Sequence, residues 1–127
     1  MIAYSRGAAA YRQVEAQSRS PLELVVMLYD GALARLTEGA AAAARGDVRA
    51  RGVAVSKALT IIGSLQETLN LTAGGDVAAE LDRLYTYASG RLLDVSLKGD
   101  VSGIQEVHRL LSGLREAWHQ IAQSTTP

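Results

Sequence analysis

Four stretches of this chain carry apolar residues at spacings of three and four, which limits what it can fold into. In the first, these positions are Leu22, Val25, Val26, Tyr29, Ala32, Leu33 and Leu36. The next three follow the same rule: Val48, Val55, Leu59, Ile62 and Leu69; then Val77, Leu81, Leu84, Ala88, Leu92 and Val95; then Ile104, Val107, Leu111, Leu114, Trp118 and Ile121. Such spacing places the apolar side chains on one face of an α-helix.

Helix-start and helix-stop signals separate the four stretches. Ser20 can cap the backbone N–H of Glu23, with Pro21 at the first helical position. Gly46 and Asp47, the run from Asn70 to Gly75 ahead of Asp76, and Gly99 each mark a boundary. We therefore expect helices at residues 21–45, 47–72, 76–98 and 101–122. Short connections make neighbouring helices antiparallel, which predicts an all-α, up-down-up-down four-helix bundle.

Composition narrows the class of protein. The chain has 127 residues, enough for one domain, and 48% of them are apolar. Thirteen basic and thirteen acidic side chains give formal neutrality, so the sequence lacks the basic excess of a nucleic-acid-binding protein. It has no cysteine and no apolar run of about 20 residues that could span a membrane. The expectation is a soluble, cytoplasmic domain with no membrane association.

Candidate catalytic and metal-binding patterns are weak. Glu116 and His119 form one Glu-x-x-His pair, but a di-iron bundle needs two such pairs and two further carboxylates. The other histidine, His108, lies about 16 Å away along the same helix. Gly74 and Gly75 lack the lysine and the length of a phosphate-binding loop. We expect no enzyme activity, no metal and no cofactor.

The segment before the bundle is predicted to be separate from it. Residues 1–19 carry a short apolar face made of Tyr4, Ala8, Tyr11 and Val14. A helix of this length is marginal in water, so the segment needs a docking surface to become ordered. It is interpreted as a movable cover, with a frayed terminus as the alternative. The bundle is assigned to residues 20–123, and residues 124–127 to a disordered tail.

Some apolar side chains fall outside the four stripes, as expected for a binding surface. They are Leu24, Met27, Leu28, Ile61, Tyr87 and Leu93. We interpret them as a groove for a partner, the alternative being cover by the N-terminal segment and uneven helix packing. Glycines also fall inside expected helices, among them Gly52, Gly63, Gly90, Gly103 and Gly113. Close helix approach is the ordinary explanation, and a soft bundle is the alternative.

The chain resembles the FliS family of flagellar secretion chaperones along nearly its whole length. The run from Ser20 to Leu33, with Met-Leu-Tyr-Asp-Gly at 27–31, is similar to the family's first helix. Further matching runs follow in order: Ser56-Lys57-Ala58, Ile61-Ile62, Leu69-Asn70, Gly74 to Ala78, Leu84 to Tyr87, Arg91-Leu92, Glu106-Val107, Leu110-Leu111 and Ala117-Trp118.

The resemblance implies a function and partners. Family members bind the C-terminal helical region of flagellin in the cytoplasm, prevent its polymerisation and deliver it to the flagellar type III export gate. The resemblance also implies that the N-terminal segment covers part of the client groove and that Tyr11 serves in docking to the gate. The competing hypothesis is a structural bundle without a client that self-associates, for instance as a homodimer when free.

Overall fold

The computed structural model describes residues 20–69 and 71–124. Its elements are α2 (Pro21–Ala44), α3 (Val48–Glu67), α4 (Leu71–Lys98) and α5 (Ser102–Ser124). Within these described ranges there are four helices and no strand, which confirms the all-α four-helix bundle. The predictions for residues 1–19 and 125–127 lie outside the described residues.

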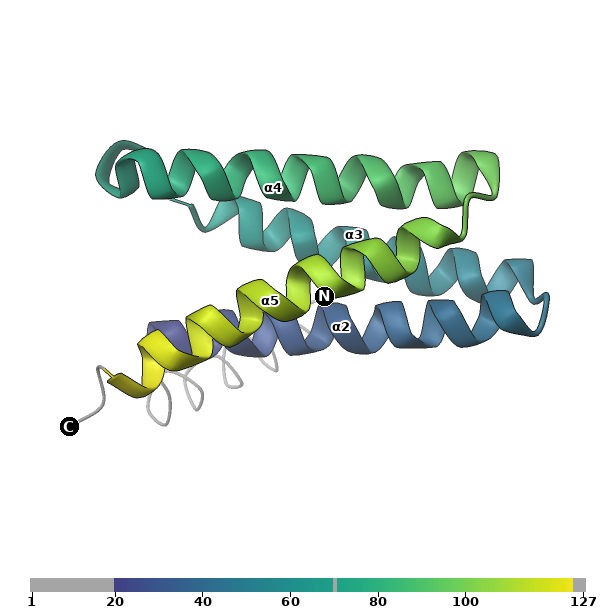
Figure 1. Cartoon of the computed structure of the whole chain (residues 1–127), viewed down its shortest axis with the longest axis horizontal. Helices are drawn as coiled ribbons and strands as arrows, with labels where there is room; N and C mark the ends of the chain where they lie inside the picture. Colours follow the sequence, from purple (N-terminus) through teal and green to yellow (C-terminus); the bar gives the residue numbers. More distant parts are fainter. Residues whose placement is uncertain (1–19, 70, 125–127) are drawn as a thin grey trace, which may run out of the picture.

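The helices form a ring in which sequence neighbours are also neighbours in space. α2 makes its main contacts with α3 and α5, and α4 makes its main contacts with the same two helices. α2 and α4 therefore lie diagonally opposite each other. Figure 1 shows α5 crossing obliquely in front of α3 and α2, with its C-terminal end close to the start of α2. One end of the bundle thus gathers the beginnings of α2 and α4 and the ends of α3 and α5.

Local capping chemistry sets two of the helix starts as predicted. The Ser20 hydroxyl accepts a hydrogen bond of 3.1 Å from the backbone N–H of Glu23. The Asp47 carboxylate accepts one of 3.0 Å from the N–H of Ala50. Gly46 precedes it with φ 75°, a left-handed conformation that favours glycine after a helix end.

The connection between α3 and α4 differs from the sequence prediction. α3 ends at Glu67 rather than 72, and the Thr68 hydroxyl donates a hydrogen bond of 2.6 Å to the Leu65 carbonyl. α4 already begins at Leu71, and its only non-helical backbone lies at Gly75, with φ 57° and ψ −133°. Residues 71–75, which were predicted from the sequence to form a loop, are therefore a helical turn followed by a kink, because glycine alone adopts that φ at little cost.

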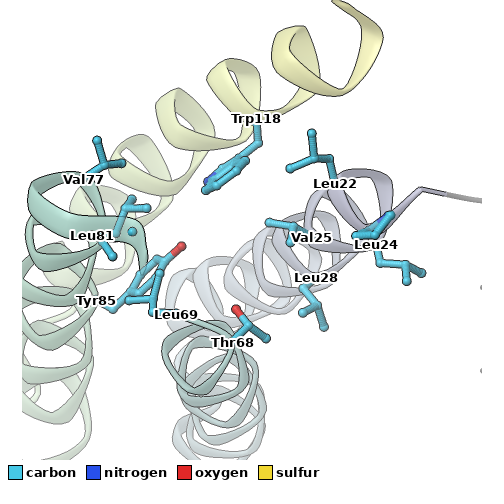
Figure 2. A pocket seen from close by; sticks show the side chains of 13 residues that line it. Leu22, Leu24, Val25, Leu28, Thr68, Leu69, Val77, Leu81, Tyr85 and Trp118 are labelled. Atoms are coloured by element: carbon cyan, nitrogen blue, oxygen red, sulfur yellow. The ribbon is translucent and has the colours of Figure 1, made fainter. Parts of the chain in front are cut away.

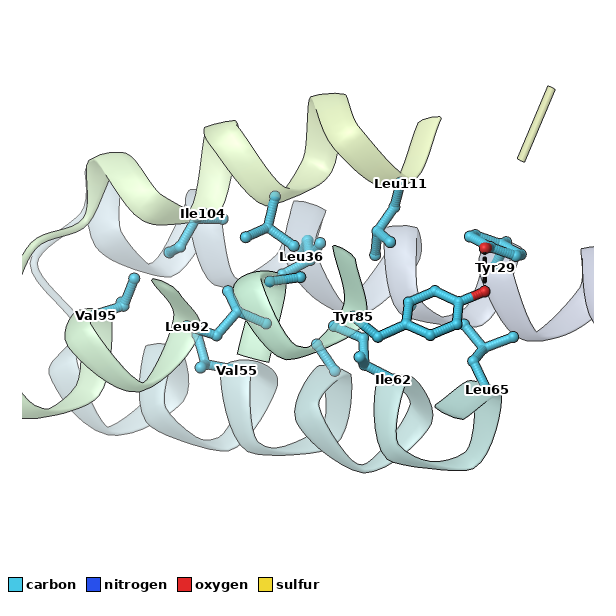
Figure 3. Close-up of a cluster of buried hydrophobic side chains, with 14 of the residues drawn as sticks. Tyr29, Leu36, Val55, Ile62, Leu65, Tyr85, Leu92, Val95, Ile104 and Leu111 are labelled. Carbon is cyan, nitrogen blue, oxygen red and sulfur yellow. Dashed lines mark hydrogen bonds between the residues drawn. The ribbon is translucent and has the colours of Figure 1, made fainter. Parts of the chain in front are cut away.

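The core follows the predicted stripes in the middle of each helix (Figure 3). Its fully buried large side chains are Tyr29, Leu36, Val55, Ile62, Leu65, Tyr85, Leu92, Val95, Ile104, Val107 and Leu111. Leu65 and Tyr85 were not part of the predicted stripes. Near the helix ends the predicted burial is wrong, since Val48, Val77 and Ile121 are 64%, 69% and 46% exposed. These residues stand at or near the first or last turns, where a facing helix covers less of the stripe.

Close approach explains only one of the five glycines singled out in the sequence. A Cβ built on Gly103 would lie 3.0 Å from the Arg91 carbonyl oxygen and 3.0 Å from Val95 Cγ2, so α5 needs glycine there to approach α4. The other four, Gly52, Gly63, Gly90 and Gly113, would meet no described atom within 4 Å. For these four, the packing explanation is wrong.

Candidate functional site

An apolar pocket of about 490 Å³ opens at the end of the bundle where all four helices meet. Figure 2 shows side chains from α2, from the end of α3, from α4 and from α5 around one space. The lining residues are Pro21, Leu22, Leu24, Val25, Leu28, Thr68, Leu69, Gly74, Val77, Ala78, Leu81, Tyr85 and Trp118. We refer to this feature as the end pocket. Its walls are almost wholly aliphatic and aromatic, as expected of a site for apolar side chains.

Three polar groups are hydrogen-bonded to one another beside the end pocket, two of them on its lining residues Tyr85 and Trp118. The Trp118 indole N–H donates a hydrogen bond of 3.2 Å to the Tyr29 hydroxyl. The hydroxyls of Tyr29 and Tyr85 share a short hydrogen bond across the diagonal of the bundle (Figure 3). Burial raises the pKa of both tyrosines, and for Tyr29 the bond to Tyr85 raises the pKa further. Both rings are therefore neutral hydrogen-bonding groups throughout the physiological range.

The sequence predicted the position of Trp118 correctly but missed the burial of Tyr85. Trp118 was predicted to pack between helices, and it does pack against the core, but it also forms a wall of the pocket. Leu84 was assigned to the core stripe, whereas the structure buries Tyr85 to 1% exposure and leaves Leu84 only half-buried. The signal was present, since Tyr85 continues the spacing of four from Leu81 and is three residues before Ala88.

The structure separates the six predicted groove residues into different surroundings. Leu24 and Leu28 both line the end pocket. Met27 instead lines a smaller polar cleft of about 300 Å³ between α2 and α5, beside the ion pair in which Arg115 Nε lies 2.9 Å from Asp30 Oδ1. The six residues therefore do not surround one cavity.

The remaining three predicted groove residues lie along the sides of the bundle. Ile61 is half-buried and packs against the core, where its Cδ1 lies 3.4 Å from a Cβ built on Gly31. Tyr87 and Leu93 are about half exposed on α4 and are not among the lining residues of the end pocket. Sequence reasoning missed Leu22, Val25, Leu69, Leu81 and Trp118 as pocket residues because it assigned them to the core.

An ion-pair cluster joins α4 to α5 toward the other end of the bundle. Arg91 donates hydrogen bonds of 2.7 Å to Glu106 and 3.0 Å to Asp100. Tyr87 donates to Glu106 as well, and this bond followed by that of Arg91 lowers the pKa of Glu106. The Ser102 hydroxyl and Arg91 lower the pKa of Asp100. The cluster faces solvent, and its ion pairs form when the carboxylates of Asp100 and Glu106 are ionised.

No helix in the described part of the chain combines the length and the apolar character needed to cross a bilayer. Among the same residues, no three histidine, aspartate or glutamate side chains gather closely enough to hold a metal ion.

Comparison with known proteins gives a consistent result. The family model described as "Flagellar protein FliS" matches residues 4–125. The flagellar secretion chaperone FliS of Salmonella typhimurium is 42% identical over 121 residues, covering 91% of this chain and 90% of the relative. FliSB of Pseudomonas aeruginosa is 34% identical, with 88% and 92% covered. FliS of Bacillus subtilis is 32% identical, with 91% and 85% covered.

Proposed function

This chain belongs to the FliS family, and from that premise we propose that it is a cytosolic export chaperone for flagellin. It binds the C-terminal helical region of flagellin, prevents premature polymerisation and delivers the client to the flagellar type III export gate. The proposal implies a binding role without catalysis and without a cofactor.

The end pocket is the observation that carries the proposal. A polymerisation-prone segment hides its apolar face best as an amphipathic helix laid against an apolar cavity, with its anchor side chains inside. Leu24 and Leu28 stand one helical turn apart on the α2 wall of such a cavity. We assign these two, together with Trp118, to the client site. Met27, Ile61, Tyr87 and Leu93 stay predictions as additional contacts outside the pocket.

A sizing-column experiment tests this function. The protein is mixed with a C-terminal fragment of the flagellin from the same organism, and a one-to-one heterocomplex is expected. Leu24→Ser should weaken binding about tenfold or more, because it places a hydroxyl where an apolar contact is needed. Leu97→Ser is the matched control, since Leu97 is 79% exposed and lies outside the pocket. A self-associated species that the fragment leaves unchanged would favour the competing structural bundle instead.

The N-terminal segment is proposed as a movable cover that also docks to the gate. Residues 1–19 lead directly to Pro21 and Leu22 at the rim of the end pocket. The apolar face of Tyr4, Ala8, Tyr11 and Val14 buries about 200 Å², worth about 5 kcal/mol before the entropy of ordering the segment is subtracted. Ordering a dozen residues costs more than this at about 1–2 kcal/mol each, so we expect the segment to dock only weakly and to exchange between docked and free.

Two variants test the cover and the docking role separately. Deleting residues 1–17 should leave the bundle folded and the affinity for the flagellin fragment equal or higher. Tyr11→Ala should leave flagellin binding unchanged yet lower flagellin secretion by cells that carry only this variant. If the deletion abolishes binding, the segment is part of the client site and the cover hypothesis is wrong.

A further inference from the structure

The hydrogen bonds among Trp118, Tyr29 and Tyr85 leave one donor without an acceptor among the described residues. Trp118, Tyr29 and Tyr85 together present three polar hydrogens, one from each side chain. Two bonds join them: the indole N–H of Trp118 to the Tyr29 oxygen, and one bond between the two hydroxyls. Whichever hydroxyl donates in that second bond, the other hydroxyl hydrogen has no acceptor among the described residues.

Tyr85 is the residue positioned to offer this hydrogen to a ligand. Tyr85 lines the end pocket, whereas Tyr29 does not. Figure 2 shows the Tyr85 hydroxyl directed into the space enclosed by Val25 and Trp118. The arrangement in which Tyr29 donates to Tyr85 leaves the free hydrogen on the pocket side. Tyr85 is 1% exposed, and an unused donor in such surroundings gains from an acceptor brought in by a partner.

Acidic residues outnumber basic ones along the segments that line the end pocket, although the whole chain is neutral. Seven carboxylates belong to residues within two positions of a lining residue: Glu23, Asp30, Glu67, Asp76, Glu80, Asp82 and Glu116. By the same criterion two arginines, Arg19 and Arg83, offset them in part. Arg83 pairs with Glu80 at 2.5 Å, and Arg115, three positions from Trp118, pairs with Asp30 and Glu116. This end of the bundle therefore attracts a positively charged segment.

We propose that the end pocket selects a basic amphipathic client segment with an apolar anchor and an adjacent unbonded carbonyl, which accepts the hydrogen of Tyr85. Main-chain carbonyls inside a helix are already bonded, so the acceptor is an asparagine or glutamine side chain or a carbonyl in the last helical turn. This inference rests on the proposed chaperone function and adds a rule for which part of the client enters this end.

Synthetic peptides titrated against the intact protein test the rule, with the fluorescence of its single tryptophan, Trp118, as the readout. Three helical peptides without tryptophan share one leucine anchor. The first has arginine flanks and a glutamine beside the anchor, the second has glutamate flanks, and the third keeps the arginines but replaces the glutamine with leucine.

The first peptide should bind about tenfold or more tighter than the second, with the gap narrowing as salt is added. It should bind about three- to tenfold tighter than the third at any salt concentration. Tyr85→Phe should remove the preference for glutamine. Thr86→Val on the same helix is the matched control and should retain it, because Thr86 lies outside the pocket and its hydroxyl accepts from Gln66.

The outcomes separate this inference from the proposed function. Equal binding of the arginine- and glutamate-flanked peptides, a glutamine preference that survives Tyr85→Phe, or no tryptophan response to any peptide would overturn the inference. The comparison of peptides on the unmodified protein stands even if Tyr85→Phe does not fold. If the peptide preferences hold but the flagellin fragment does not bind, the selection rule stands and the flagellin client is wrong. If the flagellin fragment binds but the peptides show none of these preferences, the proposed client stands and the selection rule is wrong.

Discussion

Replacing the four glycines that face open space with alanine should stabilise the bundle. Gly52, Gly63, Gly90 and Gly113 are helical, and a Cβ at each would meet no described atom within 4 Å. Alanine at such a site restricts the unfolded chain without a clash, which is worth about 0.5–1 kcal/mol per residue. The four sites are spread over α3, α4 and α5, so their effects should add. The quadruple variant should gain about 2–4 kcal/mol in free energy of unfolding.

Gly103 provides the internal control for that experiment. Its added Cβ would lie 3.0 Å from both the Arg91 carbonyl oxygen and Val95 Cγ2, and the backbone oxygen cannot move aside cheaply. Gly103→Ala should therefore destabilise the protein by about 1–3 kcal/mol.

Urea unfolding followed by far-ultraviolet circular dichroism measures both effects, with an unchanged m-value as the sign that the transition is comparable. A quadruple variant that is neutral or less stable would refute the assignment of these sites as open. A stabilising Gly103→Ala would refute the close approach of α5 to α4. The stabilised variant also addresses function, since weaker flagellin binding would indicate that the native softness of the helices helps them to accommodate a client.

Three other predictions follow from burial, capping and charge. Leu111→Ala should cost about 2–5 kcal/mol of unfolding free energy in urea, because Leu111 is fully buried; a cost below about 1 kcal/mol would contradict its place in the core. Ser20→Ala should cost about 1 kcal/mol through loss of the α2 cap, and Ser20→Asp should restore most of it. The pKa values of Asp100 and Glu106 are lowered in the folded protein. Their contribution to the free energy of unfolding is therefore complete above the ordinary carboxyl pKa of about 4 and is lost as the pH falls from there through the lowered pKa values. Arg91→Met should reduce the loss of stability at acid pH, measured as the urea midpoint at a series of pH values. A pH profile that the substitution leaves unchanged would show that the ion-pair cluster does not contribute to stability.

The sequence alone determined the features that depend on local chemistry. The Ser20 and Asp47 caps need only a short side chain and a backbone N–H three residues away, so a pattern in the sequence suffices to place them. The central stripes are equally local, because the helical repeat puts Val55 and Ile62, or Leu92 and Val95, on one face whatever the neighbours are. The order of helices followed from these elements and the shortness of their connections.

Only the tertiary structure decided which apolar side chains form the core and which form the pocket. Val77 follows the same period as Leu81, but the kink at Gly75 and the ends of the neighbouring helices leave it exposed at the pocket. Tyr29, Tyr85 and Trp118 lie on three different helices and meet only because these helices pack in one particular register, which no local sequence pattern predicts. The glycines behave likewise, because Gly103 and Gly113 look alike in the sequence and differ only in how near α4 lies. Such distances are set by the packing of whole helices, and for that reason the site became visible only once the bundle was assembled.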